Sequence, residues 1–297
     1  MGAQRSPDKH KKKLKVAYDA KQRHWVGDGF YVHGLLRPND QLNQLISPFV
    51  LMDYASPHNF PKTAARLGVG EHPHRGFETV TFAYQGEVQH QDSAGGGGVI
   101  KSGDVQWMTA GKGVVHSEFH SETFAKTGGI FEMVQLWVNL PKKHKMTPPK
   151  YQALASETFP QVPLNGDATL RVIAGEYGKH KGPASTFTPM NIYDLLSSKG
   201  GAYEFPLAHG SNTILLVMQG SATVGDQEYT EQTILIFDRD GGELAFEASK
   251  DFKGLILNGE PIEEPMVAYG PFVMNTKEEI VEAMKDYQNG EMGKLKP

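Results

Sequence analysis

Two pairs of side chains that could bind a metal recur at the same short spacing in the first half of the chain. The stretch "EHPHRGFETVTF" (71–82) carries His72 and His74, and "GKGVVHSEFH" (111–120) carries His116 and Glu118. Alternate residues of a β-strand face the same side, so each pair presents both side chains to one surface if it lies on a strand. If the two strands are neighbours in a barrel, with these faces inward, three imidazoles and one carboxylate converge on one point.

The types of these side chains narrow the chemistry. The chain has no cysteine, which excludes disulfides and thiolate ligands and argues against a closed structural zinc site. Three imidazoles and a carboxylate suit Fe, Mn, Ni, Cu or Zn. Four protein ligands on an ion that prefers five or six leave positions open for water, O₂ or substrate. The alternative interpretation, a set of surface histidines on strands, requires the same spacing to occur twice by coincidence.

Two further residues share the spacing. Glu78 follows His74 by four positions, and it has the same strand parity as both histidines if no bulge intervenes. His120 has the same parity as His116, which would point it toward the same cavity. A histidine at the exposed end of a strand is an equal alternative for His120, and the residues alone leave Glu78 open as a ligand.

The elements that must position these residues are predicted to be strands. Glycine (33) and proline (18) separate short apolar runs such as "TVTFAY" (79–84), "NTILLVM" (212–218) and "QTILIF" (232–237). This pattern is typical of an antiparallel all-β sandwich or barrel. A helix is predicted over 276–290, because Thr276 can cap its start, Glu279 follows three residues later and Gly290 can end it. Its predicted apolar face is Ile280, Val281, Met284 and Tyr287.

The chain also repeats itself, which predicts two tandem β-barrels. "FETVTFAYQGEV" (77–88) aligns with "SNTILLVMQGSATV" (211–224) on a Thr-x₅-Gln-Gly frame. In this alignment Pro206 and Ala208 stand opposite His72 and His74, so the metal site is expected in the N-terminal barrel alone. The predicted boundaries are a basic, disordered tail over 1–14, an N-terminal metal-binding barrel over 15–145, a linker over 146–165, and a C-terminal barrel over 166–297 that ends in the helix.

Charge and hydropathy exclude several function classes. The formal net charge is −4, so no general positive field is expected to attract nucleic acid. The basic start, which carries Lys9, Lys11, Lys12, Lys13 and Lys15, is interpreted as a solvated terminus because no aromatic residues interleave with the lysines. No apolar run has the length of a signal peptide or a membrane span. A cytoplasmic protein without membrane or direct nucleic-acid binding is therefore expected.

The motifs also resemble those of a known family. "HPHRGFETV", "SGDVQWMTAGKGVVHSE" and "GPFVMNTKEEI" resemble, in order and spacing from about Asp28 to Gly290, the pirin family of the cupin superfamily. The resemblance implies two cupin barrels and one mononuclear non-haem iron, usually Fe(II), in the N-terminal barrel. It implies His72, His74, His116 and Glu118 as ligands and places Glu78 behind them. His120 departs from the pattern, because pirins usually carry proline there.

The resemblance implies two functions. The first is a quercetin 2,3-dioxygenase activity, in which a flavonol ring is opened by O₂ with release of carbon monoxide, and Glu118 takes the hydroxyl proton as the catalytic residue. The alternative is a non-enzymatic regulator whose iron responds to redox state and which binds a transcription factor or a metabolic enzyme. The barrel and its ligands also permit a storage or isomerase-type cupin that acts on a small metabolite. The partner is thus a small aromatic substrate or a protein.

Overall fold

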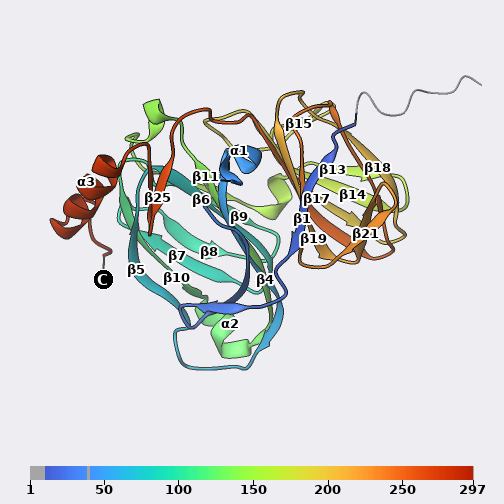
Figure 1. Ribbon diagram of the computed structural model, residues 1–297. Coiled ribbons are helices and arrows are strands. Elements are labelled where there is room, and N and C mark those ends of the chain that lie inside the picture. The colour runs from blue at the N-terminus through green and yellow to red at the C-terminus, as the bar shows by residue number, and fades with distance from the viewer. Residues whose placement is uncertain (1–10, 39–40, 297) are drawn as a thin grey trace, which may run out of the picture. The chain divides into compact units, whose positions relative to one another are not determined.

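The computed structural model describes residues 11–38 and 41–296, and it consists mainly of antiparallel β-strands (Figure 1). The chain divides into two compact units. We call the unit made of 21–38, 48–158 and 262–296 the N-terminal barrel. The other unit, the C-terminal barrel, comprises 159–261 together with 41–47 and the described residues up to Ala20. The predicted fold class, two tandem antiparallel β-barrels with a C-terminal helix, is confirmed.

The N-terminal barrel is built from two large sheets. The first has four strands, in the order β5 (Gly68–His74), β10 (Val114–His120), β7 (Val88–Asp92) and β8 (Gly97–Ile100). The second has seven strands, in the order β12 (Lys150–Leu154), β9 (Val105–Thr109), β6 (Phe77–Gln85), β11 (Gly129–Asn139), β4 (Phe49–Phe60), β3 (Phe30–Leu36) and β2 (His24–Val26). A separate hairpin pairs β25 (Val267–Tyr269) with β26 (Phe272–Met274).

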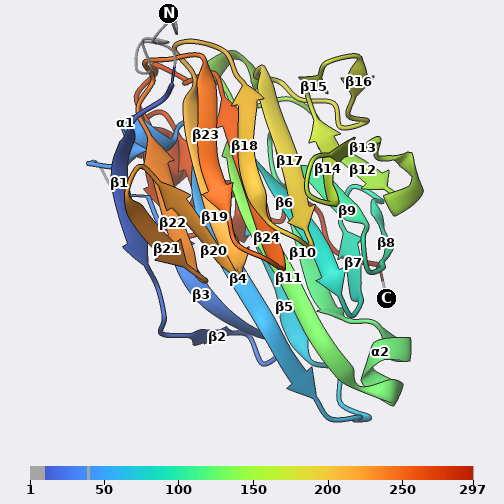
Figure 2. The same ribbon diagram turned by 90° about the vertical axis from the view of Figure 1, so that its right-hand side faces the viewer.

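The C-terminal barrel has the same two kinds of sheet (Figure 2). Its seven-stranded sheet has the order β1 (Leu14–Asp19), β22 (Thr233–Phe237), β19 (Asn212–Gln219), β24 (Phe252–Gly259), β17 (Met190–Ser197), β14 (Ala168–Ala174) and β13 (Gln161–Leu164). Its four-stranded sheet has the order β18 (Gly201–Pro206), β23 (Glu243–Ala248), β20 (Ser221–Val224) and β21 (Gln227–Thr230), and a short hairpin joins β15 (Glu176–Tyr177) to β16 (His180–Lys181).

The sequence repeat corresponds to equivalent strands. β6 and β19, which carry the aligned segments, each stand third in their seven-stranded sheet. Each strand ends at a glutamine that is followed by a glycine with positive φ, +79° at Gly86 and +74° at Gly220. A left-handed conformation favours glycine because a Cβ would be strained there. The repeat therefore conserves both the strand and the turn that ends it.

Helices are few and short. They are α1 (Asn43–Ile46), α2 (Glu122–Thr127), α3 (Lys277–Gln288) and the 3₁₀ turns η1 (Lys142–His144) and η2 (Ser156–Thr158). In α3, Thr276 and Glu279 form the predicted capping box. Its buried face is Ile280 and Ala283; the predicted Val281, Met284 and Tyr287 are exposed.

The division of the chain differs from the predicted boundaries at three places. The predicted linker 146–165 contains β12, which pairs with β9, and β13, which pairs with β14. Helix α3 belongs to the N-terminal barrel, where Figure 1 shows it beside β25 and where it packs on Val115, Phe272 and Met274. Apolar burial against that barrel explains the assignment. Strand β1 was predicted for the N-terminal barrel, but it belongs to the C-terminal barrel, where it pairs with β22.

The described part of the basic start is ordered. Lys12 is 4% exposed, and its Nζ donates a hydrogen bond to the carbonyl oxygen of Ser211 at 2.8 Å. The predicted disorder is therefore wrong for residues 11–14, and the predicted solvation is wrong for Lys12, whereas Lys11 and Lys13 are exposed. Residues 1–10 lie outside the described residues. Within the described residues, no helix has the length and hydrophobicity that crossing a membrane requires.

Candidate metal centre

Two adjacent strands bring the three predicted histidines together. β5 ends with His72 and His74, and it pairs antiparallel with β10 so that His116 stands directly opposite His72. The ring centroids are 4.2 Å apart for His72 and His116, 4.8 Å for His74 and His116, and 4.9 Å for His72 and His74. One nitrogen from each ring lies within 4.8 Å of the others. The three imidazoles therefore form one cluster that could hold a metal ion.

Backbone carbonyl groups orient two of these imidazoles. Nδ1 of His72 lies 2.7 Å from the carbonyl oxygen of Gly70, and Nδ1 of His74 lies 3.2 Å from that of Pro271. A carbonyl oxygen only accepts, so each Nδ1 carries the hydrogen and donates it. With Nδ1 protonated in this way, Nε2 is the nitrogen left to bind a metal ion, which is the arrangement that a metal-binding histidine needs.

The third imidazole has a buried nitrogen with no partner. Nε2 of His116 is fully buried and makes no hydrogen bond to any described residue. Burial, and next the neighbouring histidines, hold the pKa of His74 and of His116 well below the usual range, so both rings are neutral. A buried polar atom without a partner costs free energy unless a ligand satisfies it. This donor set fits a divalent metal ion.

Glu118 groups with only one of the three clustered histidines, His116. It lies on β10, and its carboxylate groups with His116 and His90 within 4.8 Å, not with His72 and His74. Oγ1 of Thr81 on β6 lies 3.4 Å from Glu118 Oε1 and 2.7 Å from Gln135 Oε1. Glu118, His72 and His74 all line one cavity. The structure thus brings His72, His74 and His116 together, while Glu118 groups with His116 alone of the three and shares a cavity with the other two.

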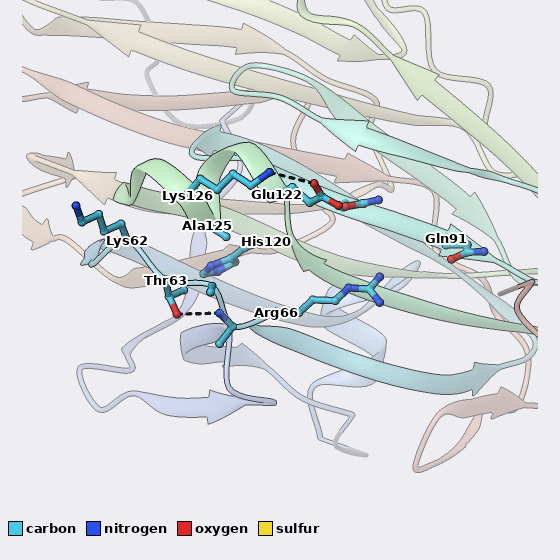
Figure 3. A pocket seen from close by; sticks show the side chains of 11 residues that line it. Lys62, Thr63, Arg66, Gln91, His120, Glu122, Ala125 and Lys126 are labelled. Carbon is cyan, nitrogen blue, oxygen red and sulfur yellow. Dashed lines mark hydrogen bonds and ion pairs between the residues drawn. The ribbon is translucent and has the colours of Figure 1, made fainter.

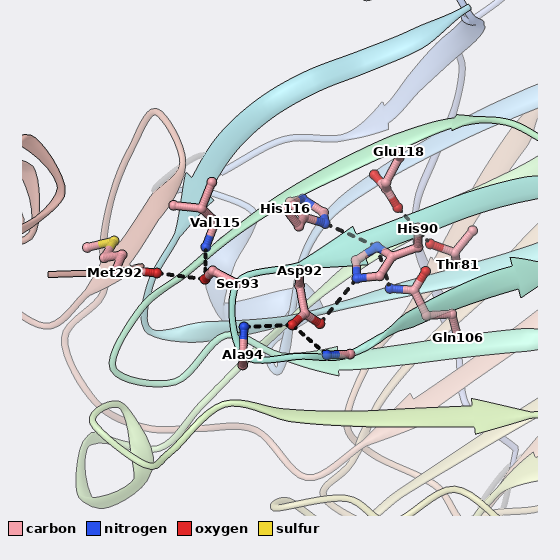
Figure 4. A network of polar contacts seen from close by, with 11 residues as sticks. Thr81, His90, Asp92, Ser93, Ala94, Gln106, Val115, His116, Glu118 and Met292 are labelled. Carbon is pink, nitrogen blue, oxygen red and sulfur yellow. Dashed lines mark hydrogen bonds and ion pairs between the residues drawn. The ribbon is translucent and has the colours of Figure 1, made fainter. Parts of the chain in front are cut away.

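Sequence reasoning missed His90. This residue lies on β7, where it pairs with Glu118 of β10, and it is 2% exposed. Figure 4 shows its ring between His116 and Asp92, at 3.4 Å from His116 Nδ1 and 3.3 Å from Asp92 Oδ2. The signal in the sequence was "VQHQD" (88–92), where His90 and Asp92 repeat the same i, i+2 spacing. Both candidate metal groups among the described residues lie in the N-terminal barrel.

Glu78 points away from the cluster, which corrects its predicted parity and its expected place behind the ligands. On β6, Thr81 faces Glu118, and its cross-strand neighbour Gln106 faces His90. Glu78 has the opposite parity and accepts a hydrogen bond from Thr109 Oγ1 at 2.7 Å. The reason is that His74 and Glu78 belong to different strands in different sheets, separated by Arg75 and Gly76.

His120 lies in an aromatic cluster at the other end of β10. Its Nε2 donates to the carbonyl oxygen of Gly29 at 2.8 Å, and its ring stacks on Phe131 with centroids 4.8 Å apart. Burial lowers the pKa of His120. Figure 3 shows it in a separate pocket of about 810 Å³ beside α2, near Lys62 and Arg66. His120 is buried, and it does not line the cavity beside His72 and His74.

A cavity of about 360 Å³ opens next to the histidine cluster. Its walls are largely apolar, and three polar side chains besides the histidines reach it: Asp53, Gln135 and Glu118. Burial raises the pKa of Asp53, although the guanidinium of Arg37 opposes this shift. The apolar lining residues are Val26, Phe30, Val32, Leu51, Val69, Met133 and Trp137. Such a cavity could hold a small molecule beside the histidines.

The C-terminal barrel has a different interior. Its core is filled by apolar side chains, among them Tyr193, Phe205 and Leu215. Pro206, which stands opposite His72 in the sequence alignment, is the last residue of β18. Since β18 and β23 occupy the places of β5 and β10 in the equivalent sheet, the strands are retained where the histidines are not.

Comparison with known proteins gives consistent matches along the chain. The pirin family model matches residues 32–138, and the model of the pirin C-terminal cupin domain matches residues 192–293. A solved structure of quercetin 2,3-dioxygenase from Acinetobacter baumannii is 52% identical, covers 95% of this chain and 99% of its own, and superposes with a TM-score of 0.92. A Pseudomonas aeruginosa protein, named provisionally as a quercetin 2,3-dioxygenase, is 51% identical over 94% of this chain and 98% of its own. Pirin from Rattus norvegicus is 34% identical over 84% of each chain.

Proposed function

The chain belongs to the pirin family of two-barrel cupins, and from this we propose that it is a metal-dependent dioxygenase that opens the ring of a flavonol, as a quercetin 2,3-dioxygenase does. The observation that carries the proposal is the buried Nε2 of His116, which has no hydrogen-bond partner in the described part of the chain. It lies beside two oriented imidazoles and next to a largely apolar cavity. The solved structure that is 52% identical is named for this activity, which supports the same assignment here.

The proposed ligands are His72, His74, His116 and Glu118. We infer Fe(II) as the ion, while the same nitrogen and oxygen donors also accept Mn, Ni, Cu or Zn. An ion held there would supply Lewis acidity to a chelating hydroxyl and carbonyl, and a template for O₂ chemistry. Because His72 and His74 are fixed by backbone carbonyl groups, they would keep their geometry during turnover.

The side chains of the cavity would bind and orient the substrate. Met133 and Trp137 offer apolar surface to the flat rings of a flavonol. Glu118 lines the same cavity and would take the proton of the flavonol hydroxyl, which leaves an electron-rich ring open to attack by O₂. Both oxygen atoms of O₂ are then incorporated into the product, and one ring carbon leaves as carbon monoxide. The apolar walls exclude water from the activated ring.

The test is turnover of quercetin by metal-loaded protein. Anaerobically prepared protein would be loaded with Fe(II), and its metal content, O₂ consumption and carbon monoxide release would be measured with quercetin. The expected result is one metal per chain and matched consumption and release, both abolished in His116→Ala. Metal binding without O₂ consumption would overturn the dioxygenase and favour a non-enzymatic role, whereas failure to bind any metal would overturn the site itself.

A further inference from the structure

A line of buried polar contacts ends at the back of His116 (Figure 4). Oδ1 of Asp92 accepts hydrogen bonds from the backbone N–H groups of Ala94 and Gly96, both at 2.9 Å. Oδ2 of Asp92 lies 3.3 Å from His90 Nε2, and His90 Nδ1 lies 3.4 Å from His116 Nδ1. Asp92 and His90 are 5% and 2% exposed. The line thus connects a loop to a predicted metal ligand without passing through solvent.

The charge of Asp92 fixes the position of every hydrogen along this line. Oδ1 of Asp92 accepts from two backbone N–H groups and Oδ2 faces His90 Nε2, so both oxygens act as acceptors. An ionised carboxylate only accepts, so His90 must carry its hydrogen on Nε2. A neutral His90 then has its lone pair on Nδ1, where Gln106 Nε2 also donates at 3.2 Å.

The same logic extends one residue further. The lone pair on His90 Nδ1 faces Nδ1 of His116, so His116 Nδ1 carries a hydrogen. The lone pair of neutral His116 is then on Nε2, the buried atom that has no partner among the described residues. Nε2 of His116 is therefore ready to bind a metal only while the tautomer is held in this form. Among the described residues, no backbone carbonyl is hydrogen-bonded to His116 Nδ1 as one is to Nδ1 of His72 and of His74.

We propose that Asp92 and His90 are positioning residues that set the tautomer of His116 and thereby make its Nε2 available to the metal. The inference rests on the proposed metal site and is independent of the dioxygenase activity. His90 could instead be a ligand itself, since it groups with His116 and Glu118. We favour positioning because both nitrogens of His90 already have partners, Asp92 on one side and His116 with Gln106 on the other.

The sharpest test is Asp92→Asn, which keeps the shape of the side chain but replaces one acceptor oxygen with a donor NH₂. Donor and acceptor are then exchanged at each contact from residue 92 to His116. The asparagine oxygen would stay with the two backbone N–H groups, so its NH₂ would face His90 Nε2. His90 would then donate from Nδ1, and His116 would have to accept there and carry its hydrogen on Nε2. The tautomer would be read by NMR in metal-free protein labelled with ¹⁵N-histidine. The signal of His116 Nδ1 is expected to change from a protonated to an unprotonated nitrogen, and that of Nε2 the other way. The two signals are assigned as those missing from the spectrum of His116→Gln. Affinity for Ni(II), measured by chelator competition, is expected to fall about 10–100-fold.

Ser93→Ala is the matched control. Ser93 follows Asp92 and bridges Val115 N at 3.0 Å and Met292 O at 2.6 Å, so it ties the same loop to β10 without joining the line. This variant is expected to keep both the His116 tautomer and the Ni(II) affinity. If Ser93→Ala weakens Ni(II) as much as Asp92→Asn does, or if Asp92→Asn leaves the tautomer unchanged, the proposal is overturned.

If Asp92→Asn does not fold, a second pair of variants tests whether His90 is a positioning residue or a ligand. His90→Asn keeps a side-chain oxygen that can accept from His116 Nδ1, and His90→Leu does not. The positioning role predicts that His90→Asn binds Ni(II) more tightly than His90→Leu. Equal losses in both variants would assign His90 as a ligand and overturn positioning. A wild-type protein that binds no Ni(II) would contradict the proposed metal site, while its His116 tautomer would still test this inference.

Discussion

Nδ1 of His74 lies 3.2 Å from the carbonyl oxygen of Pro271, a residue 197 positions further along the chain. Pro271 lies in the turn between β25 and β26, and together with Gly270 it also lines the cavity beside the histidines. The described C-terminal segment 262–296 belongs to the N-terminal barrel. The last part of the sequence therefore completes a site whose ligand candidates all lie in the first half.

Removal of the Arg75–Asp286 ion pair is expected to destabilise this arrangement. Arg75 follows His74, its side chain is 5% exposed, and its Nη1 lies 2.8 Å from Asp286 Oδ2 on α3. Breaking a buried pair costs about 3–5 kcal/mol, and because the Asp286 side chain is 20% exposed, we expect about 2 kcal/mol for Asp286→Asn. Urea unfolding measures the change. The control is Glu122→Gln, which breaks an exposed pair with Lys126 and should cost less than about 0.5 kcal/mol; equal costs would contradict the prediction.

Lys145→Met is expected to destabilise the contact between the turn at Gly76 and the C-terminal hairpin at Val273. Burial lowers the pKa of Lys145 to about 7, yet its Nζ donates to Gly76 O, Asn139 Oδ1 and Val273 O at 2.7–2.8 Å. Methionine fills the space but leaves three buried acceptors unpaired, so we expect a loss of about 3 kcal/mol in the free energy of unfolding. The neighbouring exposed Lys143→Met should change it by less than about 0.5 kcal/mol. A loss below about 1 kcal/mol for Lys145→Met would argue against a role of Lys145 in holding Gly76 and Val273 together.

The part of the site that local spacing controls could be predicted from the sequence. Two i, i+2 pairs on strands placed His72, His74 and His116 on one surface, because strand periodicity is independent of the rest of the fold. The repeat likewise predicted two barrels, since β6 and β19 are equivalent strands. Both inferences needed only the alternation of side chains and a self-alignment.

The remaining features depend on long-range packing. Glu78 lost its predicted parity because the chain changes sheets at Arg75 and Gly76, and a Cβ on Gly76 would lie 2.0 Å from Val273 O. No local pattern shows that the C-terminal hairpin approaches this turn so closely. The partner strand of β1 and the unit that α3 joins are also set by burial against distant segments. His90 was visible in spacing, but its contact with His116 requires the pairing of β7 with β10.

Glu118→Gln and Glu78→Gln should separate the two candidate carboxylates. Glu118 lines the cavity with His72 and His74, whereas Glu78 faces the other side of its sheet. We expect Glu118→Gln to weaken Fe(II) binding at least 10-fold, as loss of a charged ligand should, and Glu78→Gln to leave it unchanged. Anaerobic competition with a chromophoric chelator measures both affinities on the same preparation. Weaker binding in Glu78→Gln alone would return Glu78 to the ligand set.

Glu78 should also make the stability of the protein depend on pH. Burial raises the pKa of Glu78 to about 7 from an ordinary value of 4.5, and its Oε2 has no hydrogen-bond partner among the described residues. Between these values the folded protein retains a proton that the unfolded chain releases, so the free energy of unfolding must fall as pH rises, by about 3 kcal/mol in total. Glu78→Gln mimics the protonated acid and cannot ionise, so its advantage over wild type should grow from pH 4.5 to 8. Urea midpoints across this range measure the difference, and Glu122→Gln, which removes an exposed carboxylate, should run parallel to wild type. Parallel curves for Glu78→Gln and wild type would mean that Glu78 ionises as easily in the folded protein as in the unfolded chain, which its burial argues against.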